Sequence, residues 1–281
     1  MTDMIYYYHP NVNLKFFELI NTKKKAYWLG FLFADGYIKT NKGKPYRIGI
    51  EIDRKDVLLI QNFIEDLGLN PKFLKKNRKM VRISFSNKRM IDDLINNKLI
   101  PGRDKSYKIE LPKLESKQLY LSFLLGFYDG DGTQKTTKIT TRSLKFLKQT
   151  KTKFNLDYKI ELVRSNGLIE GRKIKGKAYR MALGSKLFNE MLDNYKESLP
   201  RKRHKFRTEE ERIEALKENA WRGGHKKKFE ASKQELEKLI NLIPLYKIGE
   251  KYGVSDKTVK KYCVRWGISI PPRGSWLMKK G

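Results

Sequence analysis

Two apolar segments of similar pattern restrict the possible folds of this chain more than any other feature. The segments are WLGFLFADG at 28–36 and LLGFYDGDG at 124–132. Each has small residues four positions apart, and such residues lie on one face of a helix, where they let two backbones approach closely. These small residues are Gly30 and Ala34 in the first segment and Gly126 and Gly130 in the second. The pattern therefore predicts two buried helices that pack against each other.

Both segments end in an aspartate followed by glycine. Asp35 and Asp131 lie 96 positions apart (131 − 35) and precede Gly36 and Gly132. Glycine commonly ends a helix in the left-handed conformation, so we expect that conformation at both glycines. One such segment would indicate no more than a buried helix with a glycine cap. Two copies with the same ending predict that the aspartates meet at adjacent helix ends.

A pair of carboxylates at two helix C-termini needs a compensating charge. Helix C-termini carry partial negative charge and unpaired carbonyls, so Asp35 and Asp131 would repel each other there. Mg²⁺ suits such oxygen ligands, because it binds one or two carboxylates together with waters and substrate phosphates. The pattern predicts a metal site that acts on a phosphodiester.

On these residues the chain resembles the LAGLIDADG homing endonucleases, in the form that carries both motifs on one chain. The resemblance places the family's essential acids at Asp35 and Asp131; the earlier motif position, which varies, holds Phe33 and Asp129. It implies that the two acids bind Mg²⁺, or Mn²⁺, or Ca²⁺ in a non-cleaving complex. The carbonyls of Ala34 and Gly130 would assist, with one DNA strand cut per acid.

A second pair of catalytic residues follows from the same resemblance. Lys105 and Lys202, 97 positions apart (202 − 105), resemble the family's basic residue after the last helix of each half. A lysine there would stabilise charge on the phosphate or polarise the attacking water. A phosphate-contacting or solvated lysine is the alternative at both positions.

The charge balance points to a polyanionic partner. Lys and Arg number 62 against 31 Asp and Glu, a formal net charge of +31, and nucleic acid is the first candidate for such an excess. The sequence has no apolar run of about 18 residues, so no membrane span is predicted. The single cysteine, Cys263, excludes an intrachain disulfide framework and is expected in a core. We therefore expect an intracellular protein, in the cytoplasm or nucleoid of a bacterial or phage-infected cell or in an organelle, and a monomer.

The periodicity of apolar residues predicts an α+β fold. It indicates two pseudo-symmetric α-β-β-α-β-β-α subdomains and a small all-α helix-turn-helix domain. The resemblance to the LAGLIDADG homing endonucleases implies that the two subdomains form a DNA-binding saddle. The expected domains are 1–105, 106–200, a basic linker at 201–231, and 232–281. Within them we expect a short covering helix at 14–20 and helices at 23–34, 55–67, 88–99, 116–130, 143–154 and 186–196. The expected strands include 46–52, 81–85, 135–141, 158–164 and 177–183, the last two joined by 166–176.

Outward-facing side chains on these strands are candidates for reading DNA, because Arg and Lys suit guanine edges in the major groove. An ordinary solvent-facing sheet is the alternative for each strand. The candidates are Lys39, Arg47, Arg82, Lys138 and Arg180.

The end of the chain predicts a separate DNA-binding module. Helices are expected at 235–243, 245–252 and 256–266, with Gly253 ending the second and Ser255 capping the third. Residues 251–281 hold eight Lys and Arg against one acid, which favours helix-turn-helix binding to DNA over a plain three-helix packing unit. Segment 271–274 is expected to be an extended arm. The candidate DNA-binding residues are Lys257, Thr258, Lys260, Lys261 and Arg265.

These observations predict a Mg²⁺-dependent, site-specific endonuclease that breaks both strands of DNA, as in intron homing. Two alternatives remain. One is a DNA-binding transcription regulator of the LAGLIDADG type without catalysis, and the presence of both acids favours an enzyme over it. The other is an intron maturase, with intron RNA as a possible partner.

Overall fold

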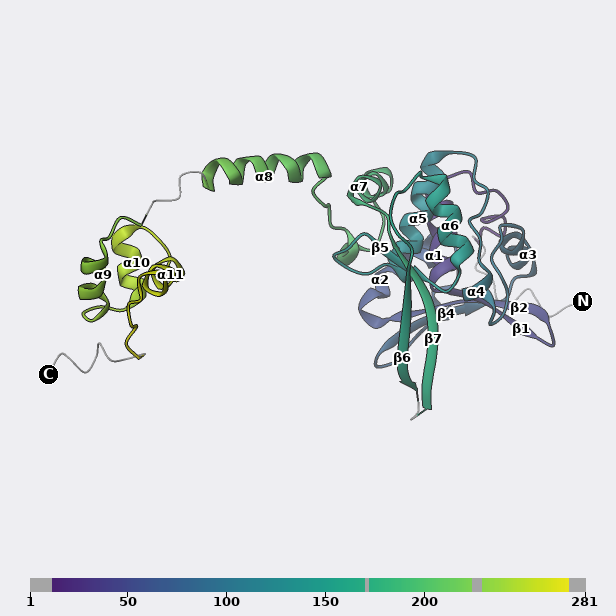
Figure 1. Ribbon diagram of the computed structural model, residues 1–281. Helices are drawn as coiled ribbons and strands as arrows, with labels where there is room; N and C mark the ends of the chain where they lie inside the picture. The colour runs from purple at the N-terminus through teal and green to yellow at the C-terminus, as the bar shows by residue number, and fades with distance from the viewer. Residues whose placement is uncertain (1–11, 170–171, 224–228, 273–281) are drawn as a thin grey trace, which may run out of the picture. The chain divides into compact units, whose positions relative to one another are not determined.

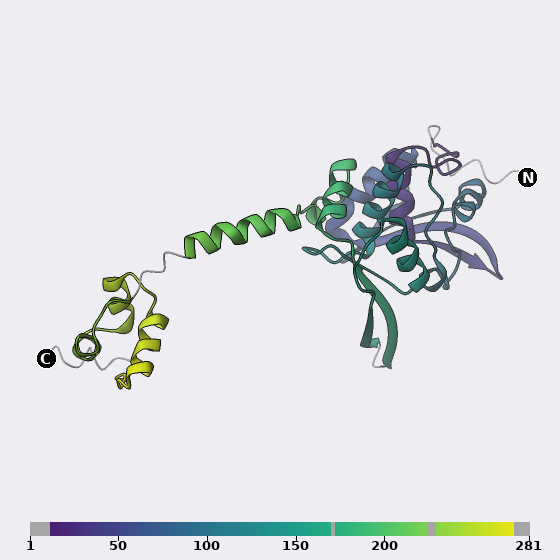
Figure 2. The ribbon, with the colours of Figure 1, turned by 45° about the horizontal axis from the view of Figure 1, so that its top comes forward.

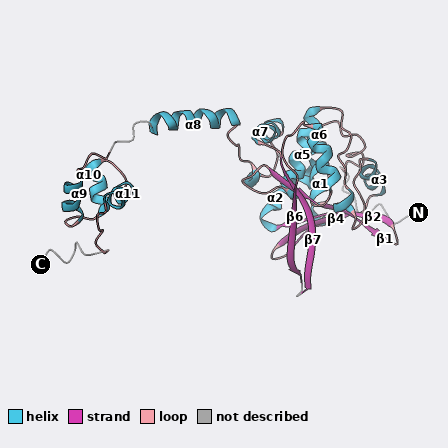
Figure 3. Cartoon of the chain, viewed as in Figure 1, coloured by secondary structure: helices cyan, strands magenta, loops and turns pink. Residues whose placement is uncertain are grey.

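The computed structural model describes residues 12–169, 172–223 and 229–272, and the chain divides into two compact units, 1–208 and 209–281. Each unit has its own hydrophobic core. The fold class is α+β, as expected: antiparallel sheets and helices form the first unit, and helices alone form the second (Figure 3). Within the described residues, no helix is long and apolar enough to cross a membrane.

The first half of unit 1 has the expected α-β-β-α-β-β-α order. Its elements are α1 Lys23–Ala34, β1 Gly36–Asn41, β2 Lys44–Asp53, the 3₁₀ turn η2 Arg54–Asp56, α2 Val57–Leu67, η3 Pro71–Phe73, β3 Leu74–Lys76, β4 Met80–Phe85 and α3 Lys88–Asn96. The antiparallel sheet has the strand order β1-β2-β4-β3. The covering helix expected at 14–20 is wrong, because the segment forms turns that bury Phe16, Phe17 and Ile20.

The second half repeats this plan with a shortened first hairpin. A short helix, α4 Lys105–Lys108, follows α3 at the end of the first half. The elements of the second half are α5 Lys117–Asp131, β5 Lys138–Thr141, α6 Leu144–Lys153, β6 Glu161–Ile169, β7 Arg172–Ala182, α7 Ser185–Asn194 and η4 Pro200–Lys202. Its described sheet has the order β5-β7-β6. A single bridge, Gly132 to Ile139, takes the place of the β1–β2 hairpin, where Gly36 pairs with Ile50.

The β6–β7 hairpin is longer than the sequence indicated. The connection expected at 166–176 belongs largely to the two strands, which pair in register from Glu161 with Arg180 to Ile169 with Arg172. The hairpin projects away from the helices as a two-stranded ribbon in both views (Figures 1 and 2).

Helices α1 and α5 pack side by side at the centre of unit 1 (Figures 1 and 2). A Cβ atom at Gly30 would lie 1.9 Å from the Phe123 carbonyl oxygen, and one at Gly126 would lie 2.0 Å from the Tyr27 carbonyl oxygen. At Gly130 it would lie 2.3 Å from the Ala34 Cβ. The predicted close approach of two small-residue faces is confirmed. After their polar first turns both helices are buried on all sides, over 26–33 in α1 and 119–129 in α5, as expected for apolar helices surrounded by neighbours.

The glycines after the two aspartates do not adopt the expected left-handed conformation. Gly132 has φ −85° and ψ 145°, and Gly36 begins β1 without a positive φ. Their small size is required for a different reason: a Cβ would lie 2.5 Å from the Leu32 Cδ2 at Gly36 and 2.2 Å from the Tyr128 Cδ2 at Gly132. At both glycines the backbone turns directly from helix into an extended conformation and lies against the last helical turn.

Unit 2 contains α8 Glu209–Gly223 and a compact group of three helices, α9 Lys233–Ile240, α10 Leu245–Tyr252 and α11 Asp256–Trp266. Gly253 ends α10 with a left-handed φ of 64°, and the Ser255 hydroxyl accepts a hydrogen bond from the Thr258 N–H to cap α11, both as expected. Cys263 is buried in the core with Leu236 and Val259, which confirms its expected place. Of the arm expected at 271–274, residues 273 and 274 lie outside the described residues.

Candidate active site

Two aspartates meet where α1 and α5 end. Asp35 caps α1, donating its N–H to the Phe31 carbonyl, and Asp131 is the last residue of α5. The Asp35 carboxylate lies against Gly130, where an added Cβ would be 3.2 Å from Asp35 Oδ2. Burial raises the pKa of Asp131 to about 7, the Asp35 charge adds to this shift, and Lys105 and Lys202 oppose it. Burial also raises the pKa of Asp35. The pair would therefore gain from a bound cation.

Each motif helix ends on a lysine ammonium from its own half. Lys105 Nζ donates to the carbonyls of Ala34 and Gly36 at 2.5 Å and of Leu32 at 3.3 Å. Burial lowers the pKa of Lys105 to about 8, although Asp131 and Asp35 oppose the shift. The lysine is a partly buried cap of α1, placed beside the carboxylates, and not a solvated side chain.

Lys202 occupies the corresponding place at the end of α5. Its Nζ donates to the carbonyls of Asp129 at 2.7 Å and Gly132 at 2.9 Å, and to those of Tyr128 and Gly130 at 3.1 Å. The residue is only 6% exposed, and burial lowers its pKa. The two lysines that the sequence placed 97 positions apart therefore lie at equivalent positions of the two halves.

The two lysines also bind the carbonyl oxygens that are expected as metal ligands. The Ala34 oxygen accepts from Lys105 and the Gly130 oxygen accepts from Lys202. A carbonyl oxygen has two lone pairs, so each retains one for a further contact. Within the described chain, no three or more His, Cys, Asp or Glu side chains come together as a metal cage. Two carboxylates completed by waters and phosphate oxygens fit Mg²⁺, which rarely uses an all-protein cage.

Asp129 has a different role from its motif neighbours. Its Oδ2 accepts hydrogen bonds from the Tyr27 hydroxyl and the Leu199 N–H, both at 2.7 Å, and it joins α1, α5 and the segment before η4. It is 3% exposed, its Oδ1 has no partner, and burial raises its pKa to about 7. The matching position in α1, Phe33, packs edge-on against Phe123 at 5.1 Å.

Two small cavities flank the carboxylates, and their linings differ. A cavity of about 220 Å³ touches Asp131 and is lined by Lys105, Arg142 and Thr140, among others. One of about 230 Å³ touches Asp35 and is lined by acids. These acids are Glu51, Asp53, Asp56 and Asp129, with Arg201 beside them. The region beside Asp131 is basic and the region beside Asp35 is acidic.

Sequence reasoning missed Arg142 and Asp56 as residues of this region. Arg142 Nη1 donates to the Tyr107 hydroxyl at 2.7 Å, with its guanidinium 5.1 Å from the ring centre. Asp56 binds Arg201, 145 positions later. The local sequence around Asp56 carries no sign of so distant a partner, since an acid at the start of a helix is common for local reasons.

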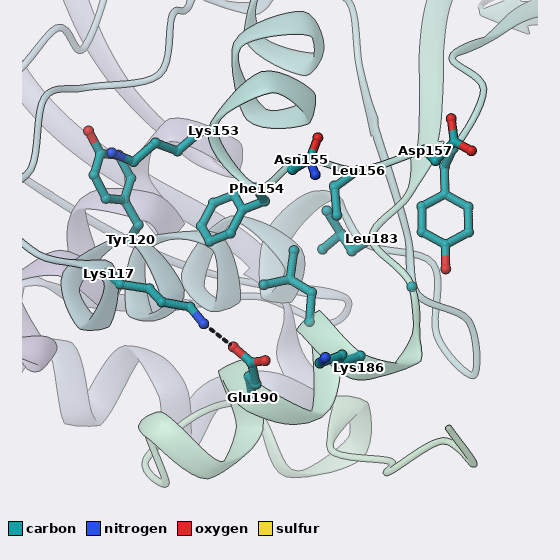
Figure 4. A pocket seen from close by; sticks show the side chains of 13 residues that line it. Lys117, Tyr120, Lys153, Phe154, Asn155, Leu156, Asp157, Leu183, Lys186 and Glu190 are labelled. Carbon is teal, nitrogen blue, oxygen red and sulfur yellow. Dashed lines mark ion pairs between the residues drawn. The ribbon is translucent and has the colours of Figure 1, made fainter. Parts of the chain in front are cut away.

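A wider cavity lies elsewhere in the second half (Figure 4). It has a volume of about 760 Å³ and is lined by residues of α5, α6 and α7 and of the connecting segments 154–158 and 183–184. Lys117 forms an ion pair with Glu190 at 2.7 Å, and Lys153 lies 4.3 Å from the Tyr120 ring centre. None of the predicted site residues lines it, so it is separate from the carboxylate pair.

The strand residues proposed for DNA contact lie at the sheet surfaces. Lys39 on β1 and Arg47 on β2 are exposed and directly opposite each other, and Arg82 is exposed on β4. Lys138 and Arg180 are half-buried and both bind Glu161, at 3.8 and 3.0 Å. The structure brings the first three together on one sheet and the other two together on the other.

In unit 2, the basic candidates of α11 share an accessible surface. Lys257, Lys260, Lys261 and Arg265 are exposed, whereas Thr258 is half-buried. The Thr258 hydroxyl lies 3.0 Å from the Ser255 hydroxyl at the start of the helix, so it also takes part in the cap.

Comparisons with known proteins give no family assignment. No family model matches the chain, and no curated protein matches it. Solved structures do match, at low similarity. The meganuclease I-SmaMI bound to uncleavable DNA is 13% identical, covering 62% of this chain and 85% of that chain, with a TM-score of 0.40.

Two other matches are of the same order. A structure of mesophilic variants of the homing endonuclease I-DmoI is 16% identical, covering 64% of this chain and 90% of that chain, with a TM-score of 0.38. Full-length WhiA from Thermatoga maritima is 13% identical and covers 92% of this chain and 96% of that chain, with a TM-score of 0.37. All three TM-scores lie below 0.5.

Proposed function

We propose that this protein is a divalent-metal-dependent endonuclease that cuts both strands of double-stranded DNA at a specific site, as a homing endonuclease does. The observation that carries the proposal is the meeting of Asp35 and Asp131 at the ends of two closely packed helices, each capped by a lysine. The resemblance of segments 28–36 and 124–132 to the LAGLIDADG motifs supports the same function.

The residues around the carboxylates have separate roles in this proposal. Asp35 and Asp131 would hold Mg²⁺, with the free lone pairs of the Ala34 and Gly130 carbonyls close by. When bound, the ion would stabilise charge on the phosphate and acidify a water molecule. Lys105 and Lys202 offset the negative helix ends, and their positive charge stabilises the charge that develops on the phosphate.

The strand residues and unit 2 would supply the grip on DNA. Lys39, Arg47 and Arg82 on one sheet and Lys138 and Arg180 on the other suit contacts to phosphates and to base edges. In unit 2 we propose helix-turn-helix binding, with α11 contacting DNA through its exposed lysines and Arg265. The net charge of +31 matches such a partner.

The deciding experiment is cleavage of a randomised duplex DNA library by the full chain with Mg²⁺, followed by sequencing of the cut ends. A double variant, Asp35→Asn with Asp131→Asn, is the matched control because it keeps the shape of both side chains. Recurrent cut sites that vanish in the control support an endonuclease. Selective binding without cleavage would contradict it and favour a regulator, and preferential binding of structured RNA would favour a maturase.

A further inference from the structure

An ion pair joins the first half of unit 1 to the segment that carries Lys202. The Arg201 guanidinium donates from Nε to Asp56 Oδ1 at 2.8 Å and from Nη2 to Asp56 Oδ2 at 2.6 Å. This two-point contact fixes the plane of the guanidinium as well as its position. Asp56 ends η2, just before α2, whereas Arg201 lies in η4 at the end of the second half. The pair therefore connects the two halves of unit 1.

The burial of this pair makes it hard to replace. Asp56 is 7% exposed and the Arg201 side chain is 33% exposed. When Arg201 is removed, Asp56 remains as a buried, unpaired charge, which is strongly unfavourable. The segment around Arg201 is thus held against the first half by a contact with a defined geometry.

Lys202 directly follows Arg201 in the same 3₁₀ turn. Its ammonium has three protons but faces four carbonyls at the end of α5, at distances of 2.7 to 3.1 Å. A small shift of the turn would change which carbonyls it binds and where its charge lies relative to Asp131. Contacts within the second half also hold the segment. Among them, the Leu199 N–H donates to Asp129, the Gln134 amide donates to the Arg201 carbonyl at 3.0 Å, and the Arg203 guanidinium donates to the carbonyls of Leu192 and Tyr195 at 2.8 and 2.9 Å.

The segment that carries Lys105 is anchored by other contacts. The Ser143 hydroxyl donates to the Ile109 carbonyl at 2.6 Å, and the Leu111 N–H donates to Gln149 Oε1 at 2.8 Å. Closer to Lys105, the Arg142 guanidinium donates to the Tyr107 hydroxyl at 2.7 Å, and the Gly102 N–H donates to the Ile38 carbonyl at 2.8 Å. None of these contacts involves Asp56 or Arg201, whereas the Asp56–Arg201 ion pair is adjacent to Lys202. The two lysines are equivalent in place, but only the position of Lys202 depends on the Asp56–Arg201 pair.

We propose that Asp56 is a positioning residue that acts through Arg201 to hold Lys202 at the end of α5. The first half thereby controls the catalytic geometry of the second half. This inference rests on the proposed endonuclease function. Its consequence is an unequal effect on the two DNA strands: loss of the pair slows the strand that depends on Lys202 and leaves the other strand nearly unchanged.

The test follows each strand separately on a duplex target labelled on both strands. Lys202→Met first identifies the strand that depends on this lysine. Asp56→Asn and Arg201→Lys are then expected to slow the same strand by about tenfold or more relative to the other. A nicked intermediate accumulates, while DNA affinity is unchanged. Arg201→Lys keeps the positive charge beside Asp56 but loses the two-point geometry, so it decides the question if Asp56→Asn fails to fold.

Two further variants separate positioning from a structural role. The exchanged pair, Asp56→Arg with Arg201→Asp, is expected to recover part of the strand ratio. Arg89→Lys is the matched control, because Arg89 also binds a carboxylate across elements, Glu18 at 2.8 Å, away from the aspartates. Equal slowing of both strands, or an unchanged strand ratio, would overturn the inference and leave the endonuclease proposal standing. Absence of any cleavage by the wild-type protein would overturn both.

Discussion

Gly30 lies so close to Phe123 that a Cβ atom at position 30 would be 1.9 Å from the Phe123 carbonyl oxygen. Gly126 has the reciprocal relationship with Tyr27, at 2.0 Å. The backbones of α1 and α5 are therefore in direct contact, and this contact brings their ends, and with them Asp35 and Asp131, into one site.

The first prediction concerns this contact. Gly30→Ala or Gly126→Ala would force the helices apart, because the obstructing atoms belong to backbone and cannot rotate away. We expect a loss of about 3 kcal/mol in unfolding free energy, at the upper end for an overpacked core. Chemical denaturation would measure it. Gly43→Asn is the control, since position 43 has open space and a left-handed φ that Asn tolerates. Equal stability of the glycine variants and wild type would refute the close packing.

The second prediction concerns the carboxylates. Asp35→Asn and Asp131→Asn are each expected to abolish DNA cleavage, because the amide loses the charge that attracts the metal. Specific DNA binding should survive, since both side chains keep their shape. Parallel cleavage and gel-shift assays with Mg²⁺ would measure the two properties. Full cleavage by either single variant would remove that residue from the site.

The third prediction concerns Lys105, whose ammonium binds three carbonyls at the end of α1. Lys105→Met removes the charge next to the phosphate and leaves those carbonyls without a donor. We expect cleavage to slow by about 100-fold or more, together with a lower melting temperature. Lys108→Met is the control, because Lys108 lies in the same short helix as Lys105 but is exposed and pairs with Asp104, the residue before the helix. A cleavage rate for Lys105→Met equal to that of the control would count against a catalytic lysine.

The fourth prediction concerns pH. In the folded protein, burial raises the pKa of Asp129 and of Asp131 to about 7 from a usual 3.8. Between these values the folded state binds more protons than the unfolded state, so stability falls as pH rises from about 4 to 7. Denaturation curves with a chelator present should show this slope. Asp129→Asn should reduce it, because the amide stays neutral, and an unchanged slope would contradict the burial of an ionisable group there.

The fifth prediction concerns unit 2. Deleting residues 232–281 removes the three-helix core but leaves the separate core of unit 1 intact. Specific affinity should fall by about 100-fold, because the tethered module adds its binding at high effective concentration. The footprint on DNA should also shorten. An unchanged footprint in a nuclease-protection assay would argue against a DNA-binding role for α11.

Local sequence patterns predicted the elements that depend on local forces. Alternation identified β2 and β4, and the cap residues Gly253 and Ser255 marked the turn between α10 and α11. The small residues four apart predicted the α1–α5 contact, because a close helix approach tolerates little else. The same reasoning was wrong for Gly36 and Gly132, where contact with the preceding helical turn, and not a left-handed φ, requires glycine.

The sequence by itself determined the two-motif plan and the candidate acids, because both depend on spacing along one chain. The two lysines at matching positions followed from the resemblance of the sequence to the LAGLIDADG homing endonucleases. Only the tertiary structure decided where the lysine ammonium groups lie, and which acids are held by partners. Lys202 meets four carbonyls, and Asp56 meets Arg201 from 145 positions away. Such contacts follow from burial and from the folding of one half onto the other, and local spacing carries no information about either.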